Sequence, residues 1–380
     1  MRIILSVTND LVTDQRVHRS CMALVEAGHN VTLVGRLLPE SLPINQPYHT
    51  RRMRLIFRKK AVFYAEYNIR LFFLLLFSHT DLFYANDTDS LPANYWASRI
   101  RRKPLFFDAH EMFPEVPELV GRPRVKAFWT KIEDRYIPRV DAAITVCQSI
   151  ADIYAQRYGI QMQVVRNVPL PRIAPITLNH PIDKQGRNLL LYQGAVNLGR
   201  GIEPMLDTMP LLPDCLFVIA GIGDKYNELQ QQVIQRGLDN QIIFLGRLPL
   251  EELQQVTRQA DLGISFLENL GLNYYYSLPN RISDFVQAGV PIVATDFPEI
   301  RRVIEGYGIG TLVPNQITDH SSVQPQQLAD IIHSTLDYWK SITPNERLKR
   351  FEKAAHDLSW ENDKKVLLSQ LEVACHPKGH

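Results

Sequence analysis

One segment of the chain, residues 277–289, combines residue types that suit the capture of a nucleotide. Its apolar residues recur at helical spacing, so we expect a helix whose buried face is separate from the face with Arg281 and Asp284. Asn280 is the expected N-cap of this helix. A helix N-terminus and Arg281 both favour anions, while Asp284 can accept hydrogen bonds from the two hydroxyls of a ribose. The same residues would also suit an ordinary capped helix with a surface arginine and aspartate.

Two glycine-containing turns lie upstream, each directly after an apolar strand-like run. The first begins at Gly194 and ends at Gly201, and it includes the permanent cation Arg200. The second contains Gly221 and Gly223. Such turns expose backbone N–H groups that can bind phosphate, although one glycine turn by itself is weak evidence. Their positions after consecutive strands strengthen the prediction of a phosphate site.

A cluster of ionisable residues follows an apolar run in the first half of the chain. Asp108, His110 and Glu111 come directly after residues 105–107. Two carboxylates and an imidazole at the end of a strand could position an acceptor hydroxyl or a sugar. A histidine whose ring is satisfied by neighbouring backbone is the alternative.

Two other charged stretches are less specific. Asp14 and Arg16 follow the first strand-like run and would either face a ligand crevice or form a local ion pair. Asp87 and Asp89 have the D-x-D spacing of a metal-dependent sugar transferase site. We do not predict a metal site there, because carboxylates two positions apart are common and that site belongs to a different architecture.

Alternating strand and helix signals predict the elements that position these residues. Apolar strand-like runs precede helical patterns in both halves of the chain, which indicates two doubly wound α/β domains with parallel sheets. The expected strands are residues 3–7, 30–34, 82–85, 105–107, 142–146 and 164–165 in the first half, then 189–193, 216–220, 242–245, 262–266 and 290–295. A proline-rich stretch, residues 168–181, is the expected linker, and a last amphipathic helix is expected over residues 357–373. Ligands of such sheets bind beyond the carboxyl ends of the strands.

Length and charge limit the possible classes. A chain of 380 residues exceeds one ordinary core, and 45% hydrophobic with 22% charged residues is typical of a globular protein. The net charge of +2 is uneven: residues 1–180 contain 24 Lys+Arg and 16 Asp+Glu, and the rest 18 and 24. The basic half could attract an anionic acceptor or a membrane surface, or simply have a solvated basic face.

Neither disulfides nor a membrane span is expected. The four cysteines are far apart, which fits a reducing cytoplasm. The first apolar run is too short for the apolar region of a signal peptide. The longest apolar run, residues 71–77, is much shorter than a membrane-spanning helix. Residues 51–60 are basic and aromatic, so together with residues 71–77 they would contact an anionic membrane surface. Residues 71–77 would otherwise form an ordinary buried helix.

Seven stretches, in order, resemble the motifs of the family-four (glycosyl transferases group 1) retaining glycosyltransferases, which have the GT-B fold. They are DQRV (14–17), DAHE (108–111), VRNVP (165–169), GRG (199–201), GIG (221–223), LPNRISDF (278–285) and AGVP (288–291). The resemblance implies an acceptor-side domain over residues 1–172, a donor-side domain over residues 185–355, and a C-terminal helix, residues 356–380, packing back on the first domain. By this resemblance, His110 would lie near the transferred sugar. Gly194 and Arg200 would lie at the diphosphate of the nucleotide, with Arg281 near the diphosphate and Asp284 at the ribose.

The chain departs from the family pattern at several positions. The glutamate usually found eight positions before the ribose carboxylate is Tyr276, and Glu268 could replace it only if its loop folds back. Ala195 stands where many members carry an arginine. These departures leave the donor sugar open.

The resemblance implies metal-independent transfer, with retention, from a UDP- or GDP-linked sugar, and no cofactor. The acceptor would be a glycan, a lipid-linked or a small molecule, in polysaccharide or glycoconjugate synthesis; no nucleic acid is expected. The location would be the cytoplasm, at the inner face of the membrane. Two rival hypotheses are a non-catalytic subunit that binds a nucleotide sugar and a GT-B-type sugar-nucleotide epimerase.

Overall fold

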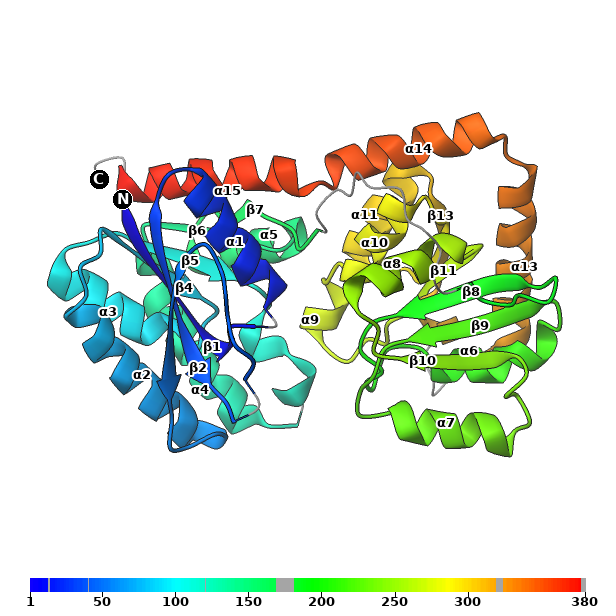
Figure 1. The fold of residues 1–380 in the computed structure, drawn as a ribbon, viewed down its shortest axis with the longest axis horizontal. Helices are drawn as coiled ribbons and strands as arrows, with labels where there is room; N and C mark the ends of the chain where they lie inside the picture. The colour runs from blue at the N-terminus through cyan, green and yellow to red at the C-terminus, as the bar shows by residue number, and fades with distance from the viewer. Residues whose placement is uncertain (13, 40, 120, 169–180, 319–323, 377–380) are drawn as a thin grey trace. The chain divides into compact units, whose positions relative to one another are not determined.

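The computed structural model describes two compact units, each with its own parallel sheet (Figure 1). Unit 1 comprises Met1–Asn167 and Glu361–His380, and unit 2 comprises Val168–Trp360. The residues described are 1–12, 14–39, 41–119, 121–168, 181–318 and 324–376. Most of the expected proline-rich linker, residues 169–180, lies outside them.

Unit 1 has a seven-stranded sheet in the order β3-β2-β1-β4-β5-β6-β7, and all neighbouring pairs are parallel. Its strands are β1 (Arg2–Asp10), β2 (Asn30–Leu37), β3 (His49–Arg54), β4 (Leu82–Asn86), β5 (Leu105–Ala109), β6 (Ala142–Thr145) and β7 (Gln163–Val164). Strands β4, β5 and β6 are buried along their whole length, as expected for a sheet covered on both faces.

Helices cover both faces of the first sheet. They are α1 (Gln15–Glu26), α2 (Lys60–Leu76), α3 (Leu91–Arg101), α4 (Pro123–Tyr136), α5 (Gln148–Tyr158) and α15 (Trp360–Cys375). Figure 1 shows α1 and α15 on one face, and α2 and α3 on the other. The C-terminal helix is fixed to this unit by an ion pair of 2.7 Å between Asp363 and Arg166, and by one between Lys364 and Glu26.

Unit 2 has a six-stranded parallel sheet in the order β10-β9-β8-β11-β12-β13, the doubly wound order of dinucleotide-binding folds. Its strands are β8 (Asn188–Gln193), β9 (Cys215–Ala220), β10 (Ile242–Gly246), β11 (Leu262–Ser265), β12 (Ile292–Thr295) and β13 (Gly310–Val313). Its helices are α6 (Glu203–Thr208), α7 (Tyr226–Gln235), α8 (Leu250–Gln259), α9 (Leu272–Tyr275), α10 (Asn280–Ala288), α11 (Pro298–Tyr307), α12 (Asn315–Thr318), α13 (Pro325–Ser341) and α14 (Pro344–Asp357).

The predicted fold class is confirmed: both sheets are parallel and doubly wound. The sequence order reverses direction between β1 and β4 in the first sheet and between β8 and β11 in the second. At such a switch point the loops after the two strands part, leaving space for a ligand at the carboxyl ends. None of the described helices combines the length and apolar character that crossing a bilayer requires.

Candidate functional site

The predicted charged cluster of unit 1 lies at the carboxyl edge of its sheet, beside the switch point. Asp108, near the end of β5, is fully buried and pairs with Arg16 of α1 at 2.6 Å. Tyr84 donates its hydroxyl hydrogen to the same carboxylate, and Arg16 also donates to the carbonyl oxygen of Val165. Arg16 therefore forms no local ion pair with Asp14, which instead caps α1 by accepting the N–H of Val17.

His110 lies between two carboxylates. Its Nδ1 is 3.2 Å from Asp87, and its Nε2 is 3.5 Å from Asp108 and 3.3 Å from the side-chain oxygen of Asn86. Burial favours the neutral imidazole, but the carboxylates of Asp87 and Asp108 outweigh it and raise the pKa of His110 to about 9. At neutral pH the ring therefore carries a proton on both nitrogens, and His110 is a fixed cation and not a general base.

Asp87 is the residue that fixes His110, and the sequence did not single it out for this role. It occupies the left-handed region at φ 59°, and its carboxylate also accepts the backbone N–H of His110 at 2.8 Å. Burial raises the pKa of Asp87, while the neighbouring His110 opposes that rise. Its D-x-D partner Asp89 accepts the hydroxyl of Thr8 at 2.5 Å.

Two further carboxylates belong to this region. Glu111 follows His110, is partly exposed, and its charge raises the pKa values of Asp87 and Asp89 further. Burial raises the pKa of Asp89 to about 7. The unit 1 cluster thus holds several acidic groups around one imidazole, and its main charges are compensated within the protein.

In unit 2 the predicted Gly194 turn leaves the end of β8 at the switch point. Gly194 is exposed, and its φ of 129° is one that other residues rarely adopt. A Cβ atom there would lie 3.6 Å from Nη2 of Arg281, so this guanidinium packs directly against the turn. The turn and the first residues of α10 therefore come together, as the sequence predicts for one anion site.

Arg281 is buried, which excludes the alternative of a surface arginine on an ordinary helix. Its guanidinium lies over the ring of Tyr192 at 4.3 Å, and its Nη1 is buried without a hydrogen-bond partner. Arg200 lies over the ring of Tyr274 at 4.6 Å, and its Nε is likewise buried and unpartnered. Burial lowers the pKa of Arg281, and the charge of Arg200 lowers it further, so the two cations are close enough to repel.

Neither arginine pairs with a carboxylate among the described residues. Two adjacent cations in a partly desolvated site are costly unless an anion neutralises them. Arg281 lies beside the exposed Gly194 turn at the switch point. The arrangement suits the diphosphate of a nucleotide, which Arg guanidinium groups bind through paired N–H donors.

The remaining predicted glycines pack loops together. A Cβ at Gly221 would lie 1.8 Å from the carbonyl oxygen of Gly194, and one at Gly223 would lie 2.2 Å from the Asn197 side chain. At Gly201 it would meet Phe266 at 2.2 Å. These residues are required for the close approach of the loops after β8, β9 and β11, and they shape the turn at which Gly194 is exposed.

Asp284 lies in the second turn of α10, near the end of β8. Its carboxylate accepts the amide of Gln193 at 2.9 Å, and Gln193 in turn accepts the hydroxyl of Thr257 at 2.7 Å. This chain of hydrogen bonds fixes the orientation of the carboxylate. The expected N-cap is wrong: Pro279 occupies that position and Asn280 begins the helix, without a side-chain cap.

The loop after β11 brings Glu268 to the same edge. Glu268 is buried, and its backbone N–H donates to the carbonyl oxygen of Gly199 at 3.0 Å. The loop that carries Glu268 therefore lies against the Gly199 turn, and its role in place of the missing upstream glutamate stays a prediction. Tyr276 lies just beyond α9, partly exposed.

Two family models cover these two regions. Residues 14–169 match Glycosyltransferase Family 4, and residues 187–337 match Glycosyl transferases group 1. The chain belongs to this glycosyltransferase family. The resemblance inferred from the motifs is confirmed, and the two matches follow each other in the order that the GT-B fold requires.

Solved structures show the same fold over nearly the whole chain. The sucrose-phosphate synthase of Thermosynechococcus elongatus is 18% identical with a TM-score of 0.74, covering 98% of both chains. HepE of Anabaena in complex with UDP-glucose is 16% identical with a TM-score of 0.71, covering 98% of this chain and 99% of that one.

Among curated relatives, chitobiosyldiphosphodolichol beta-mannosyltransferase of Candida albicans is 28% identical over 210 residues, 50% of this chain and 44% of its own. The chain spans less than half the length of the curated relatives it matches.

One group of potential metal ligands in the described chain lies away from both clusters. Asp214, Cys215 and His333 bring their ligand atoms within 4.8 Å of one another. Cys215 begins β9, so this group lies at the amino edge of the second sheet, opposite the Gly194 turn. It takes no part in the candidate site.

Proposed function

We propose that this chain transfers a sugar from a nucleotide-sugar donor to a glycan, lipid-linked or small-molecule acceptor, with retention of anomeric configuration. The observation that carries the proposal is the pair of uncompensated cations, Arg200 and Arg281, beside the Gly194 turn. When the bond between sugar and phosphate breaks, negative charge builds on the leaving diphosphate. Fixed cations that have no other partner stabilise that charge more than they stabilise the ground state.

The donor is a UDP- or GDP-linked sugar. Asp284, fixed by Gln193, supports a place for the ribose hydroxyls next to the diphosphate. HepE, which has the same fold, is described in complexes with UDP and with UDP-glucose.

The state of His110 supports transfer without a protein base at that position. An imidazole with a pKa of about 9 is already protonated at neutral pH and cannot take the proton of an acceptor hydroxyl. In the proposed mechanism the leaving phosphate takes this proton, and His110 and Glu111 line the place of the transferred sugar, with the buried Asp108 fixing His110 from behind. The reaction requires no metal.

We propose that the enzyme works in the cytoplasm at the inner face of a membrane, in polysaccharide or glycoconjugate synthesis. Support comes from the outer face of α2, where Ile69, Phe73 and the following Phe77 are more than half exposed. The basic residues 51–60 precede this face. Buried Leu71 and Leu75 show that the same helix also packs on the sheet, so both predicted roles of residues 71–77 find support. Co-sedimentation with anionic and neutral liposomes tests the contact, and no binding to anionic vesicles at low salt rejects it.

A ligand screen followed by product analysis tests the catalytic proposal. Nucleoside diphosphates and their sugars are screened by thermal shift, because a ligand that binds only the folded chain raises its stability. Transfer is then measured with the binding donor and a panel of acceptors, and NMR of the product gives the anomeric configuration. Inversion of the anomeric centre would reject the retaining mechanism, but the proposed transferase activity would still stand.

The same experiment separates the two rivals. A chain that binds the nucleotide sugar but neither transfers nor hydrolyses it is a non-catalytic subunit. Conversion of the donor to an epimeric sugar nucleotide without acceptor identifies an epimerase.

A further inference from the structure

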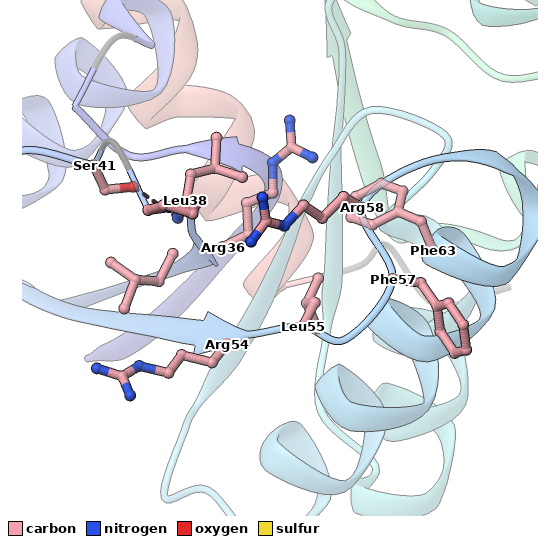
Figure 2. A pocket seen from close by; sticks show the side chains of 10 residues that line it. Arg36, Leu38, Ser41, Arg54, Leu55, Phe57, Arg58 and Phe63 are labelled. Carbon is pink, nitrogen blue, oxygen red and sulfur yellow. Dashed lines mark hydrogen bonds between the residues drawn. The ribbon is translucent and has the colours of Figure 1, made fainter.

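A cavity of about 380 Å³ lies at the carboxyl ends of β2 and β3 in unit 1, outside the site described above. Three arginines line it: Arg36 from the end of β2, Arg54 from the end of β3, and Arg58 from the loop that follows. Figure 2 shows Arg36 and Arg58 extending into the same central region, while Arg54 extends away from them. The cavity is thus a basic hollow with apolar walls.

Among the described residues, none of Arg36, Arg54 and Arg58 forms an ion pair with a carboxylate. Nε of Arg36 is buried without a hydrogen-bond partner, while its guanidinium lies over the buried ring of Phe63 at 5.1 Å. The stacked position restrains Arg36, so little flexibility has to be lost when it binds an anion.

Two described carboxylates near the cavity are engaged elsewhere. Glu66 of α2 accepts the backbone N–H groups of Ile56 and Phe57 at 2.9–3.0 Å and pairs with Arg70 at 2.8 Å. Asp10, at the end of β1, accepts the hydroxyl of Ser41 from the cavity wall and the N–H of Val12. Glu66 therefore holds the loop that carries Arg58 in place without neutralising it.

The cavity lies on the edge of the sheet that also carries the His110 cluster. Parallel strands end on one side, so the loops after β2, β3 and β5 share this edge. From β5 to β2 there are three strand spacings, about 14 Å at the usual separation of about 4.8 Å. A molecule bound by an anionic group in the cavity could thus extend along the edge to His110.

The side chains around the cavity indicate which part of the ligand lies beside its anionic group. Phe57 is 48% exposed at the cavity, and the preceding Ile56 is 75% exposed. Arg guanidinium groups match phosphate in geometry, and exposed apolar side chains beside them match a hydrocarbon chain.

We infer that this cavity binds the phosphate or diphosphate group of the acceptor and thereby directs the sugar end of that molecule toward His110. The inference rests on the proposed function, since it names the class of acceptor. The phosphate can come from a lipid-linked acceptor, with its chain on Phe57 and Ile56, or from a water-soluble phosphorylated sugar. Both sources share the same contacts with Arg36 and Arg58.

Calorimetric titration of the full chain tests the inference, with UDP present in excess to occupy Arg200 and Arg281. The probes are inorganic pyrophosphate, geranyl diphosphate and vesicles containing phosphatidic acid. We expect diphosphate binding to weaken about ten-fold or more in Arg58→Ala and in Arg36→Met, because each loses charge-assisted hydrogen bonds. Arg124→Ala, which removes an exposed cation of unit 1 outside the cavity, should bind like the wild type.

The outcomes separate the possibilities. Equal binding of pyrophosphate and geranyl diphosphate assigns the cavity to a soluble phosphate, whereas binding of the geranyl compound and the vesicles alone assigns it to a lipid. Undiminished binding by Arg58→Ala and Arg36→Met, or an equal loss in Arg124→Ala, overturns the inference.

Failure of the proposed function gives a different result. If the nucleotide site is wrong, UDP does not raise the melting temperature of the wild type; if only transfer fails, UDP still raises it but no transfer product forms, whatever the cavity binds. With an active transferase, Arg58→Ala should raise KM for a phosphate-bearing acceptor and leave KM for the donor unchanged.

Discussion

At the carboxyl edge of the first sheet, Arg16 pairs with Asp108, and His110 lies between two carboxylates. At the same edge of the second sheet, Arg200 and Arg281 lie over tyrosine rings and have no carboxylate partner in the described chain. The folds of the two units are alike. In unit 1 the charged groups pair with one another, whereas in unit 2 the two cations are left to pair with a ligand. Unit 1 therefore has a charge-compensated cluster, whereas unit 2 has a site that requires an anion.

This comparison also predicts how substitutions affect stability. Removing one member of a compensated buried pair leaves the other charge unpaired, which is strongly destabilising. Removing an uncompensated buried cation relieves a cost that the empty protein already bears. The same type of substitution should therefore have opposite effects in the two units.

The largest expected effect is that of Asp108→Ala. It leaves the buried guanidinium of Arg16 without its carboxylate, so the free energy of unfolding should fall by about 3–5 kcal/mol. Urea unfolding of the full chain measures the loss. Asp81→Ala is the control, because the pair of Asp81 with Arg2 at 3.1 Å is largely exposed and contributes about 0–1 kcal/mol. Equal losses in the two variants would contradict the contrast between compensated and exposed charges.

Arg281→Met should show the reverse pattern in unit 2. Turnover should fall about 10²- to 10³-fold, since the leaving diphosphate loses a fixed cation, and Arg200→Ala should lower it about 10²-fold or more. The melting temperature of the ligand-free Arg281→Met protein should be no lower than that of the wild type, while the stabilisation by UDP disappears. A lowered melting temperature with UDP binding intact would make Arg281 a structural residue.

The pH dependence of stability should reveal the His110 cluster. The pKa of His110 is about 9 in the folded chain and about 6.5 when unfolded, so its contribution to stability is complete below pH 6.5. As pH rises, the unfolded chain releases this proton first, and the contribution is lost by about pH 9. The free energy of unfolding of the wild type should therefore fall between pH 6.5 and 9 by more than that of His110→Gln. The variant retains the other titrating groups, so parallel curves would show that His110 is not paired with Asp87 and Asp108.

Much of the fold followed from local patterns in the sequence, because buried parallel strands are continuous apolar runs. The strand β3 was not predicted: residues His49–Arg54 are mostly polar, since this is the edge of the sheet and its outward groups are solvated. β13, an edge strand of unit 2, contains Gly310 and Thr311 and was missed for a similar reason. Both missed strands lie at an edge of their sheet, where only part of the strand's surface is buried and the apolar pattern is weaker.

The candidate site was predicted where residue type alone limits the possibilities, as with the Gly194 turn and Arg281. It was not predicted where the role depends on a distant partner. Asp87 meets His110 only because β4 and β5 pair in parallel, with Asn86 beside Asp108. The nearby D-x-D spacing of Asp87 and Asp89 gave no indication of this contact.

Asp284→Asn tests the contrast between the two units at one ligand contact. The substitution changes the contact of unit 2 with the ligand but keeps the shape of the side chain. The amide keeps one acceptor oxygen but loses the charge that would favour two ribose hydroxyls, so UDP binding should weaken about ten-fold. Calorimetry with UDP and with inorganic pyrophosphate measures this. Pyrophosphate has no ribose, and its affinity should be unchanged.

Thr257→Val is the matched control for that variant. It removes the hydroxyl that orients Gln193, so it loosens the carboxylate of Asp284 without altering it. UDP binding should then weaken less than in Asp284→Asn, again with pyrophosphate unaffected. If Asp284→Asn weakened UDP and pyrophosphate equally, the carboxylate would act on the electrostatics of the diphosphate site and not on the ribose. The two hydroxyl acceptors would then have to come from elsewhere on the same edge, and the buried Glu268, beside the Gly199 turn, is the residue to test next.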